Sequence, residues 1–234
     1  YTFIPGSDFD HLGVGQTATT SVTYTVTDGS ATDTATVLVT VSGTNDGPNV
    51  DGTVGDQVGV DGTAIVPLDI SRYFSDIDTG DTLEFSSTSL PPGLSIHAST
   101  GVISGTLPAN ASNGGPYAVT VTATDASGAA TSQTFNWSVT NPAPVAIDDS
   151  YAGNENDSLV GNVISGLGTD VDPDGDALTV SAINGVGASV GDSVTGTNGG
   201  SFTIMADGSL AFIPGSDFDS LGAGQTTTTQ VNYT

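Results

Sequence analysis

The chain contains the same 23-residue segment twice. Residues 3–25 read FIPGSDFDHLGVGQTATTSVTYT, and residues 212–234 read FIPGSDFDSLGAGQTTTTQVNYT. The copies agree without a gap at 18 of 23 positions, 209 residues apart (212 minus 3). Self-similarity at a fixed period indicates a tandem array of structural units. Because this period is too long for one small sandwich, each repeat is expected to comprise a pair of domains.

Between the copies, apolar residues recur at every second position. This period is typical of half-buried strands, and no stretch has sustained helical spacing. The 32 glycines punctuate the strands with turns, for example at Ala206-Asp207-Gly208, which predicts a hairpin. The pattern predicts an all-β chain of Greek-key β-sandwiches. The clearest alternations are Val22/Tyr24/Val26, Val37/Val39/Val41, Tyr117/Val119/Val121, Phe135/Trp137/Val139, Phe202/Ile204 and Leu210/Phe212.

Two proline-containing linkers divide the chain. SGTNDGPNV at 42–50 and VTNPAPVAIDD at 139–149 each follow an alternating strand, and proline ends a strand because it cannot donate to the ladder. The sequence therefore predicts one complete domain over 48–142. Residues 1–47 are expected to be the C-terminal half of a second kind of domain, and 143–234 the N-terminal part of another copy of it.

The charge balance excludes several classes of partner. The chain has 26 acidic residues and one basic residue, for a formal net charge of −25. Nucleic acids and anionic membranes need Lys or Arg to neutralise phosphate, so neither is expected as a partner. No run of about 18 apolar residues predicts a membrane span. The chain has no cysteine, so a secreted domain would need another brace in place of disulfides, such as bound metal.

Two aspartate clusters offer such a brace. FSDIDTGDTLEF presents Asp76, Asp78 and Asp81, and TDVDPDGDALTV presents four alternating aspartates, at 170, 172, 174 and 176. Calcium takes six to eight oxygen ligands, and alternating carboxylates on a glycine-containing loop can converge on it. The alternatives are simple Asp-Gly turns or a solvated acidic surface. Four carboxylates within seven residues would repel strongly, so the second cluster, Asp170, Asp172, Asp174 and Asp176, is the stronger calcium candidate.

The second cluster is not an EF-hand, although it matches the opening of that loop. Position twelve falls on Ser181 rather than Glu, and no helices flank the loop. Its remaining ligands are expected from elsewhere, such as Asp148, Asp149 or a linker carbonyl. The pairs Asp8/Asp10 and Asp217/Asp219 cannot fill a calcium shell and are interpreted as loop residues.

Several motifs resemble known families. PVAIDDSYAGNENDSLVGNV, TDVDPDGDALTV, DGSLAFIPGSDFD and VNYT resemble the bacterial cadherin-like, VCBS-type repeats of large RTX adhesins. TVTDGSATDTATVLVTVSGTNDGP at 25–48 resembles the closing half of the same family. The middle unit, with YFSDIDTGDTLEFSS, LPPGLSIHASTGVISGT and YAVTVTATDASGAATSQTFNWSV, resembles dystroglycan-type cadherin-like domains.

The resemblance implies tandem Ig/cadherin-like Greek-key β-sandwiches in an extended array, with calcium at the domain junctions. At the first junction it implies the ligands Asn45, Asp46, Asp76, Asp78 and Asp125. At the second junction it implies Asn141, Asp148, Asp149 and the 170–176 aspartates. The second linker departs from the family's NDxP form by reading TNPAP, with no acid beside Asn141.

An enzyme is not expected. The chain has no cysteine or lysine, and His11 and His97 lack a metal-binding motif; His11 is Ser220 in the second copy. The sequence instead favours a calcium-rigidified structural or adhesive region of a secreted or bacterial cell-surface adhesin, such as a biofilm adhesin or an extracellular filament. The alternative is a calcium-dependent carbohydrate-binding module with a polysaccharide ligand, although Trp137 alternates in phase with core residues.

Neighbouring repeats of the same protein are the other expected partners. Residues 26–47 of one chain are expected to complete residues 143–234 of another, by head-to-tail strand complementation. The rival is that neighbouring repeats of a longer continuous chain supply the missing strands covalently.

Overall fold

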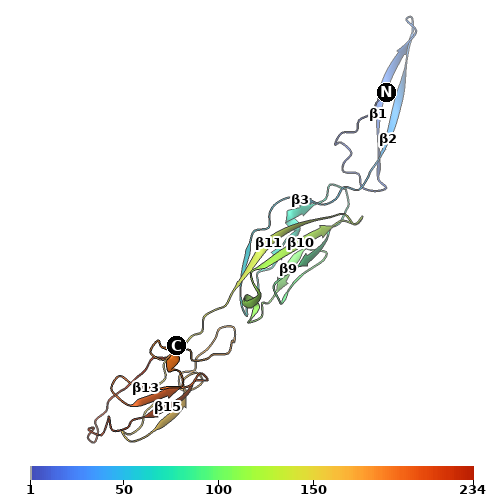
Figure 1. Cartoon of the computed structure of the whole chain (residues 1–234). Helices are drawn as coiled ribbons and strands as arrows, with labels where there is room; N and C mark the ends of the chain where they lie inside the picture. The colour runs from blue at the N-terminus through green and yellow to red at the C-terminus, as the bar shows by residue number, and fades with distance from the viewer. Residues whose placement is uncertain (1) are drawn as a thin grey trace. The chain divides into compact units, whose positions relative to one another are not determined.

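The computed structural model describes residues 2–234, and Tyr1 lies outside the described residues. The chain divides into two compact units, Tyr1–Thr140 and Asn141–Thr234. Helix in the described part is limited to three short 3-10 turns, η1 (Ser71–Tyr73), η2 (Ala111–Gly114) and η3 (Gly187–Ser189). The rest is strand, turn and loop, so the prediction of an all-β chain is confirmed (Figure 1). Among the described residues, no helix is long and apolar enough to cross a membrane.

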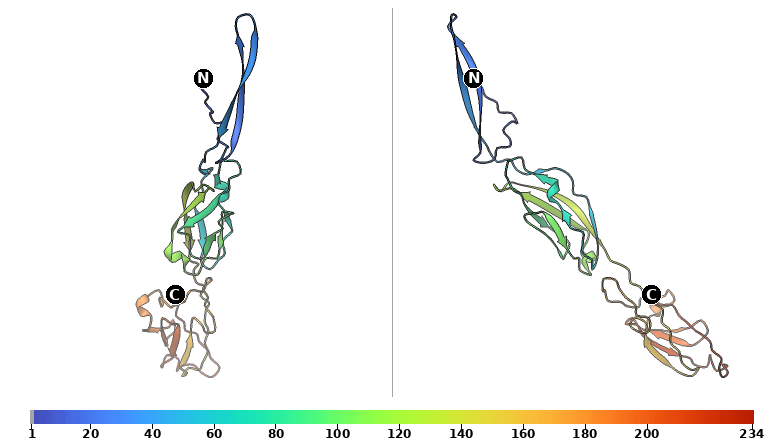
Figure 2. Two further views of the ribbon diagram at one scale, coloured as in Figure 1. Left: turned by 90° about the vertical axis from the view of Figure 1, so that its right-hand side faces the viewer. Right: turned by 180° about the vertical axis from the view of Figure 1, so that it is seen from behind.

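The first unit begins with a two-stranded ribbon. β1 (Thr17–Thr27) and β2 (Thr32–Ser42) pair antiparallel over eleven residues each, from Thr17 opposite Ser42 to Thr27 opposite Thr32. Figure 2 shows this hairpin in blue, as two strands only. The predicted apolar face of β1 is exposed, at 62% for Val22 and 46% for Tyr24, whereas Val37, Val39 and Val41 of β2 are half-buried.

The remainder of the first unit is a sandwich. Its larger sheet has the order β4-β11-β10-β7, in which β4 runs parallel to β11 and the other pairs are antiparallel. The facing strands form the sheet β5-β9-β8 and the small sheet β3-β6. The bounds are β3 (Asn49–Val50), β4 (Gln57–Val60), β5 (Leu68–Asp69), β6 (Phe74–Ser75), β7 (Glu84–Thr88), β8 (Leu94–Ile96), β9 (Val102–Gly105), β10 (Tyr117–Thr124) and β11 (Ala130–Thr140).

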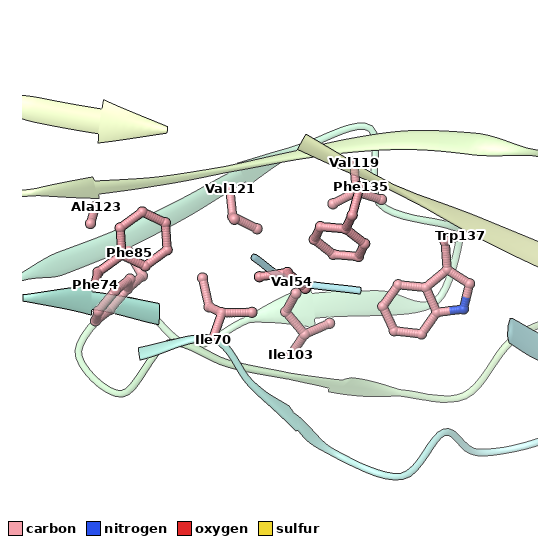
Figure 3. Close-up of a cluster of buried hydrophobic side chains, with 10 residues drawn as sticks. All are labelled: Val54, Ile70, Phe74, Phe85, Ile103, Val119, Val121, Ala123, Phe135 and Trp137. Atoms are coloured by element: carbon pink, nitrogen blue, oxygen red, sulfur yellow. The ribbon is translucent and has the colours of Figure 1, made fainter. Parts of the chain in front are cut away.

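The core of this sandwich is formed by the residues that alternate inward. Val119, Val121 and Ala123 of β10 are fully buried, and Phe135 and Trp137 of β11 lie beside them (Figure 3). Burying alternate residues of paired strands removes apolar surface from water while the other face stays polar. The prediction that Trp137 belongs to the core is confirmed, since only 2% of it is exposed.

The second unit has a four-stranded antiparallel sheet of its own. Its order is β12-β15-β14-β13, with bounds β12 (Leu159–Asn162), β13 (Ser193–Thr195), β14 (Ser201–Ile204) and β15 (Ser209–Ile213). The predicted hairpin at 206–208 is confirmed, because it joins β14 to β15. A separate core contains Val163, Val180, Ile183, Ile204 and Leu210.

Candidate metal centre

Three carboxylates of the first unit come together although they are distant in sequence. Asp76 follows the end of β6, Asp81 lies in the loop before β7, and Asp125 follows the end of β10. One carboxylate oxygen from each lies within 4.8 Å of the others. Among residues 2–234, this is the only group of three or more acidic, His or Cys side chains with that spacing. The first aspartate cluster therefore gains from Asp125 a carboxylate that its own loop does not supply.

Two buried carboxylate oxygens, one on Asp76 of this group and one on the neighbouring Asp78, have no hydrogen-bond donor. Asp76 accepts the backbone N–H of Asp78 through Oδ1 (2.9 Å), and Asp78 accepts that of Asp46 through Oδ2 (2.9 Å). The other oxygen of each, Asp76 Oδ2 and Asp78 Oδ1, is buried without a partner. A buried oxygen without a donor carries a desolvation cost. A bound cation would remove that cost by replacing the missing donors.

The linker positions Asp125. The side-chain amide of Asn45 donates to Asp125 Oδ2 (2.8 Å), and the backbone N–H groups of Ser127 (2.9 Å) and Ala129 (2.8 Å) donate to Oδ1. These bonds, led by that from Asn45, lower the pKa of Asp125. The carboxylate is therefore held ionised and in a fixed orientation.

The group of Asp76, Asp81 and Asp125 lacks a compensating positive charge, as the pKa of Asp81 shows. Burial, followed by the negative charges of Asp76, Asp125 and Asp78, raises the pKa of Asp81. The only Lys or Arg of the chain, Arg72, lies 3.7 Å from Asp69 instead. All the potential metal ligands in this group are carboxylate oxygens, and no basic side chain compensates their negative charge. The group therefore fits a hard divalent cation such as calcium. Asp76, Asp81 and Asp125 would hold it, with Asp78 beside them.

The first copy of the repeated segment supports the same loop, a contact that the sequence did not predict. The carbonyl of His11 accepts the N–H of Thr79 (2.9 Å), and Gln16 Nε2 donates to the carbonyl of Thr79 (2.8 Å). Gly13 is buried against the side chain of Asp78. Because His11 contributes its backbone and not its side chain, this contact is compatible with Ser220 at the same place in the second copy. The repeat itself was the only sequence signal.

The stronger candidate from sequence, the second cluster, has a different geometry. Asp172 Oδ1 accepts three backbone N–H groups, from Asp174 (3.1 Å), Gly175 (3.1 Å) and Asp176 (3.2 Å). This turn brings Asp174 against Asp172, with both oxygens of Asp174 buried and without donors. A shared hydrogen bond with Asp172, then burial and the charges of Asp172 and Asp176, raises the pKa of Asp174 to about 6. Asp174 is thus the least satisfied carboxylate of this unit.

Two other ligands predicted for the second junction, Asp170 and Asp149, accept hydrogen bonds from the protein instead. Asp170 Oδ1 accepts the N–H of Ile147 (2.7 Å), and Asp149 Oδ1 accepts that of Gly168 (2.9 Å). The hydroxyl of Tyr233 lies 3.3 Å from Asp149 Oδ2 and 3.4 Å from both oxygens of Asp170. Burial and these two carboxylates raise the pKa of Tyr233, which keeps its proton available to donate. Asn141, Asp148 and Asp176 are exposed, so the described structure does not gather three carboxylates here as it does in the first unit.

Other conspicuous side chains have structural positions. Asp217 accepts the N–H of Gly200 (2.7 Å), and Asp8 and Asp10 are exposed, in keeping with loop residues. Asp61, which the sequence analysis did not single out, is only 1% exposed. Its Asp-Gly context resembles an ordinary turn, so no sequence signal distinguished it.

Comparison with known proteins identifies two domain types. Residues 47–140 match the family model described as "Putative Ig domain", and residues 141–234 match the model described as "Bacterial cadherin-like domain". A search of curated proteins found no relative of the chain.

The solved structures that resemble the chain include two mouse cadherins. Mouse cadherin-23 EC22-24 is 20% identical with a TM-score of 0.40, covering 84% of this chain and 63% of that one. Mouse protocadherin-24 EC1-3 is 21% identical with a TM-score of 0.39, covering 85% and 66%. An endo-fucoidan hydrolase from glycoside hydrolase family 107 is 15% identical with a TM-score of 0.37, covering 94% and 33%. The chain spans less than two thirds of each of these structures.

The strand order, the two separate cores and the two family matches all divide the chain into two different β-domains. The chain is all-β, and its two parts resemble different families: residues 47–140 are similar to the Ig-type model and residues 141–234 to the bacterial cadherin-like model.

Proposed function

We propose that this chain is a calcium-rigidified structural or adhesive repeat region of an extracellular bacterial adhesin. The observation that carries the proposal is the convergence of Asp76, Asp81 and Asp125 beside two buried carboxylate oxygens without donors. Calcium bound there would link the β6–β7 loop to the end of β10. Through Asn45 and Asp46, the same ion would also fix the linker that precedes the Ig-like domain.

In this proposal the chain has three parts. Residues 1–47 and 143–234 are pieces of one domain type, and residues 48–142 form a complete domain between them. The proposed location is the bacterial cell surface, which is supported by the match of residues 141–234 to the bacterial cadherin-like model. A structural role is proposed rather than catalysis. Trp137 packs in the core, so it offers no platform on which a sugar ring could stack.

Calcium should raise the melting temperature. At about 5 mM calcium in fixed sodium chloride we expect a clear increase over the chelated protein, because an ion that binds only the folded state stabilises it by mass action. The gain reaches about 2.7 kcal/mol when free calcium is about a hundred times Kd. Thermal melts in calcium and in chelator, at matched ionic strength, measure it. Superimposable curves would refute the proposal.

Single substitutions locate the response. Asp81→Asn should remove most of the calcium-dependent shift, since it takes one carboxylate from the converging group. Asp8→Asn removes the same charge from an exposed loop and should leave the shift intact. Asp174→Asn tests the second cluster in the same way. If Asp8→Asn reduced the shift as much as Asp81→Asn, the effect would be general charge screening and not a bound ion.

A further inference from the structure

The two copies of the repeated segment are paired differently in the two units. Residues 17–27 form β1, which pairs with β2 and with no other strand in the described part of the chain. The corresponding residues 226–234 have no such neighbour among the described residues. They lie instead along a different surface, which belongs to the second unit.

That surface is built from residues 181–184 and 197–199. Thr234 N donates to Ala182 O (2.9 Å), Ser181 N donates to Thr234 O (2.6 Å), and Asn184 N donates to Asn232 O (2.7 Å). Tyr233 pairs antiparallel with Ile183, and its side chain packs against the second core together with Val231. The second copy therefore covers this core as an extended segment that makes one isolated bridge, between Tyr233 and Ile183.

The first copy carries the same contact residues without a surface to bind. Val22, Tyr24 and Thr25 correspond to Val231, Tyr233 and Thr234, 209 positions further on. Whereas Tyr233 packs on the second core, Val22 and Tyr24 remain 62% and 46% exposed. An apolar strand face with an unpaired edge favours the addition of another chain.

We propose that the β1–β2 hairpin of one molecule docks into the second unit of another copy and displaces residues 226–234 of that copy. β1 would take over the pairing with 181–184, placing Thr25 opposite Ala182 and Tyr24 opposite Ile183. β2 stays paired with β1 and adds a strand that the second unit does not have in the described structure. This inference rests on strand geometry and would stand if the calcium proposal failed.

Exchange of the whole hairpin is favoured over addition of β2 alone. If β2 were added to the free edge of 226–234, β1 would have to be stripped from it, which would break a ladder of eleven residue pairs. Exchange keeps that ladder. It gives up the bonds of 228–234, which the matching residues of β1, Thr19 to Thr25, then form again. It also covers Val22 and Tyr24, whose burial is favourable.

The contact joins two different surfaces, so it does not close on itself. Each molecule offers one hairpin and one acceptor surface, and a heterologous contact of this kind produces chains of molecules. The high negative charge opposes it, so association should strengthen as salt screens the charge.

Disulfide trapping between two single-cysteine proteins tests the register. The natural chain has no cysteine, so Thr25→Cys and Ala182→Cys each carry one thiol. Mixed and oxidised at about 0.5 M salt, they should form a heterodimer at least about tenfold faster than Ser21→Cys mixed with Ala182→Cys. Ser21 lies on the same exposed face of β1, four residues or about 13 Å away, beyond disulfide reach.

Two results would overturn the proposal. The first is equal trapping by Thr25→Cys and Ser21→Cys, or no trapping by either. The second is faster trapping between Thr34→Cys and Thr234→Cys, because Thr34 lies opposite Thr25 in the hairpin and would meet Thr234 only if β2 alone were added. The calcium proposal is tested by melting curves and the docking proposal by disulfide trapping. A negative result in one experiment therefore does not contradict the other proposal.

Discussion

At the scale of single residues, Asp61 is the carboxylate most deeply enclosed by the Ig-like domain. It follows β4, its N–H donates to the carbonyl of Thr140 (3.0 Å), and its Oδ1 accepts the N–H of Ser112 (2.9 Å). Its Oδ2 is buried without a partner. One oxygen thus connects two distant segments, while the other contributes only a desolvation cost.

This asymmetry makes two substitutions at Asp61 behave differently. Asp61→Ala should cost about 1–3 kcal/mol, because the partly buried N–H of Ser112 loses its acceptor. Asp61→Asn keeps an acceptor and removes the charge, so stability should stay level or rise. Urea unfolding measures both. Asp56→Ala is the matched control, since exposed Asp56 likewise accepts a backbone N–H, that of Asn136. A loss at Asp61→Ala no larger than at Asp56→Ala would contradict this account.

Sequence reasoning at this scale succeeded where a pattern was local. Alternation placed Phe135, Trp137 and Val139 correctly, because inward-facing strand residues repeat every second position. It could not anticipate that Asp125 would join Asp76 and Asp81, except through the family resemblance, because that meeting depends on which loops the fold brings to one end. Asp61 and Tyr233 gave no local signal for the same reason.

At the scale of elements, the approach of the Leu94–Ile96 and Val102–Gly105 strands depends on a glycine. Gly105 has a φ of +143°, and a Cβ there would lie 2.1 Å from the carbonyl oxygen of Gly93. No side chain fits that space, and the backbone conformation is one that residues other than glycine adopt only with strain.

Gly105→Ala should therefore destabilise the Ig-like domain by about 3 kcal/mol, the sum of backbone strain and a clash that the two strands cannot relieve. Gly55→Ala is its control. A Cβ at Gly55 meets nothing within 4 Å, and its φ is not positive, so the change should stay within about 0.5 kcal/mol. Denaturant unfolding of both variants checks the difference, and equal stabilities would show that the strands can move apart.

The sequence predicted where strands lie better than it predicted which strands pair with each other. The first copy of the repeated segment forms the predicted strand, β1, whereas the second copy makes an isolated bridge, between Tyr233 and Ile183. Residues 17–27 have β2 beside them, and residues 226–234 have the 181–184 edge instead. Local sequence determines which face of a strand is apolar, but the pairing depends on which edges are within reach.

At the scale of the whole molecule, the two units have separate cores. The Ig-like core and the core around Ile183 and Ile204 share no residue. Each contains its own paired sheet, so each has the elements needed for cooperative unfolding on its own.

Calorimetry should therefore resolve two unfolding transitions. Gly105→Ala should lower only the transition of the Ig-like domain, because it strains strands of that sandwich alone. Ile204→Ala, in the core of the second unit, should lower only the other one, by the cost of about 2–5 kcal/mol typical of such cavities. A single transition lowered equally by both substitutions would mean that the units unfold together.

The scarcity of basic residues has a consequence for how the protein resists digestion. A protease that cuts after Lys or Arg finds one peptide bond in these 234 residues, between Arg72 and Tyr73. The Arg72 side chain is accessible, but hydrogen bonds fix the backbone of Tyr73, the residue after the cleavable bond. Tyr73 N donates to Ile70 O (3.1 Å), and Asp51 N donates to Tyr73 O (2.9 Å). Cleavage would require η1 to leave the sandwich and enter the protease as an extended strand. Durability towards trypsin-like enzymes is thus built into both the composition and the place of the single arginine.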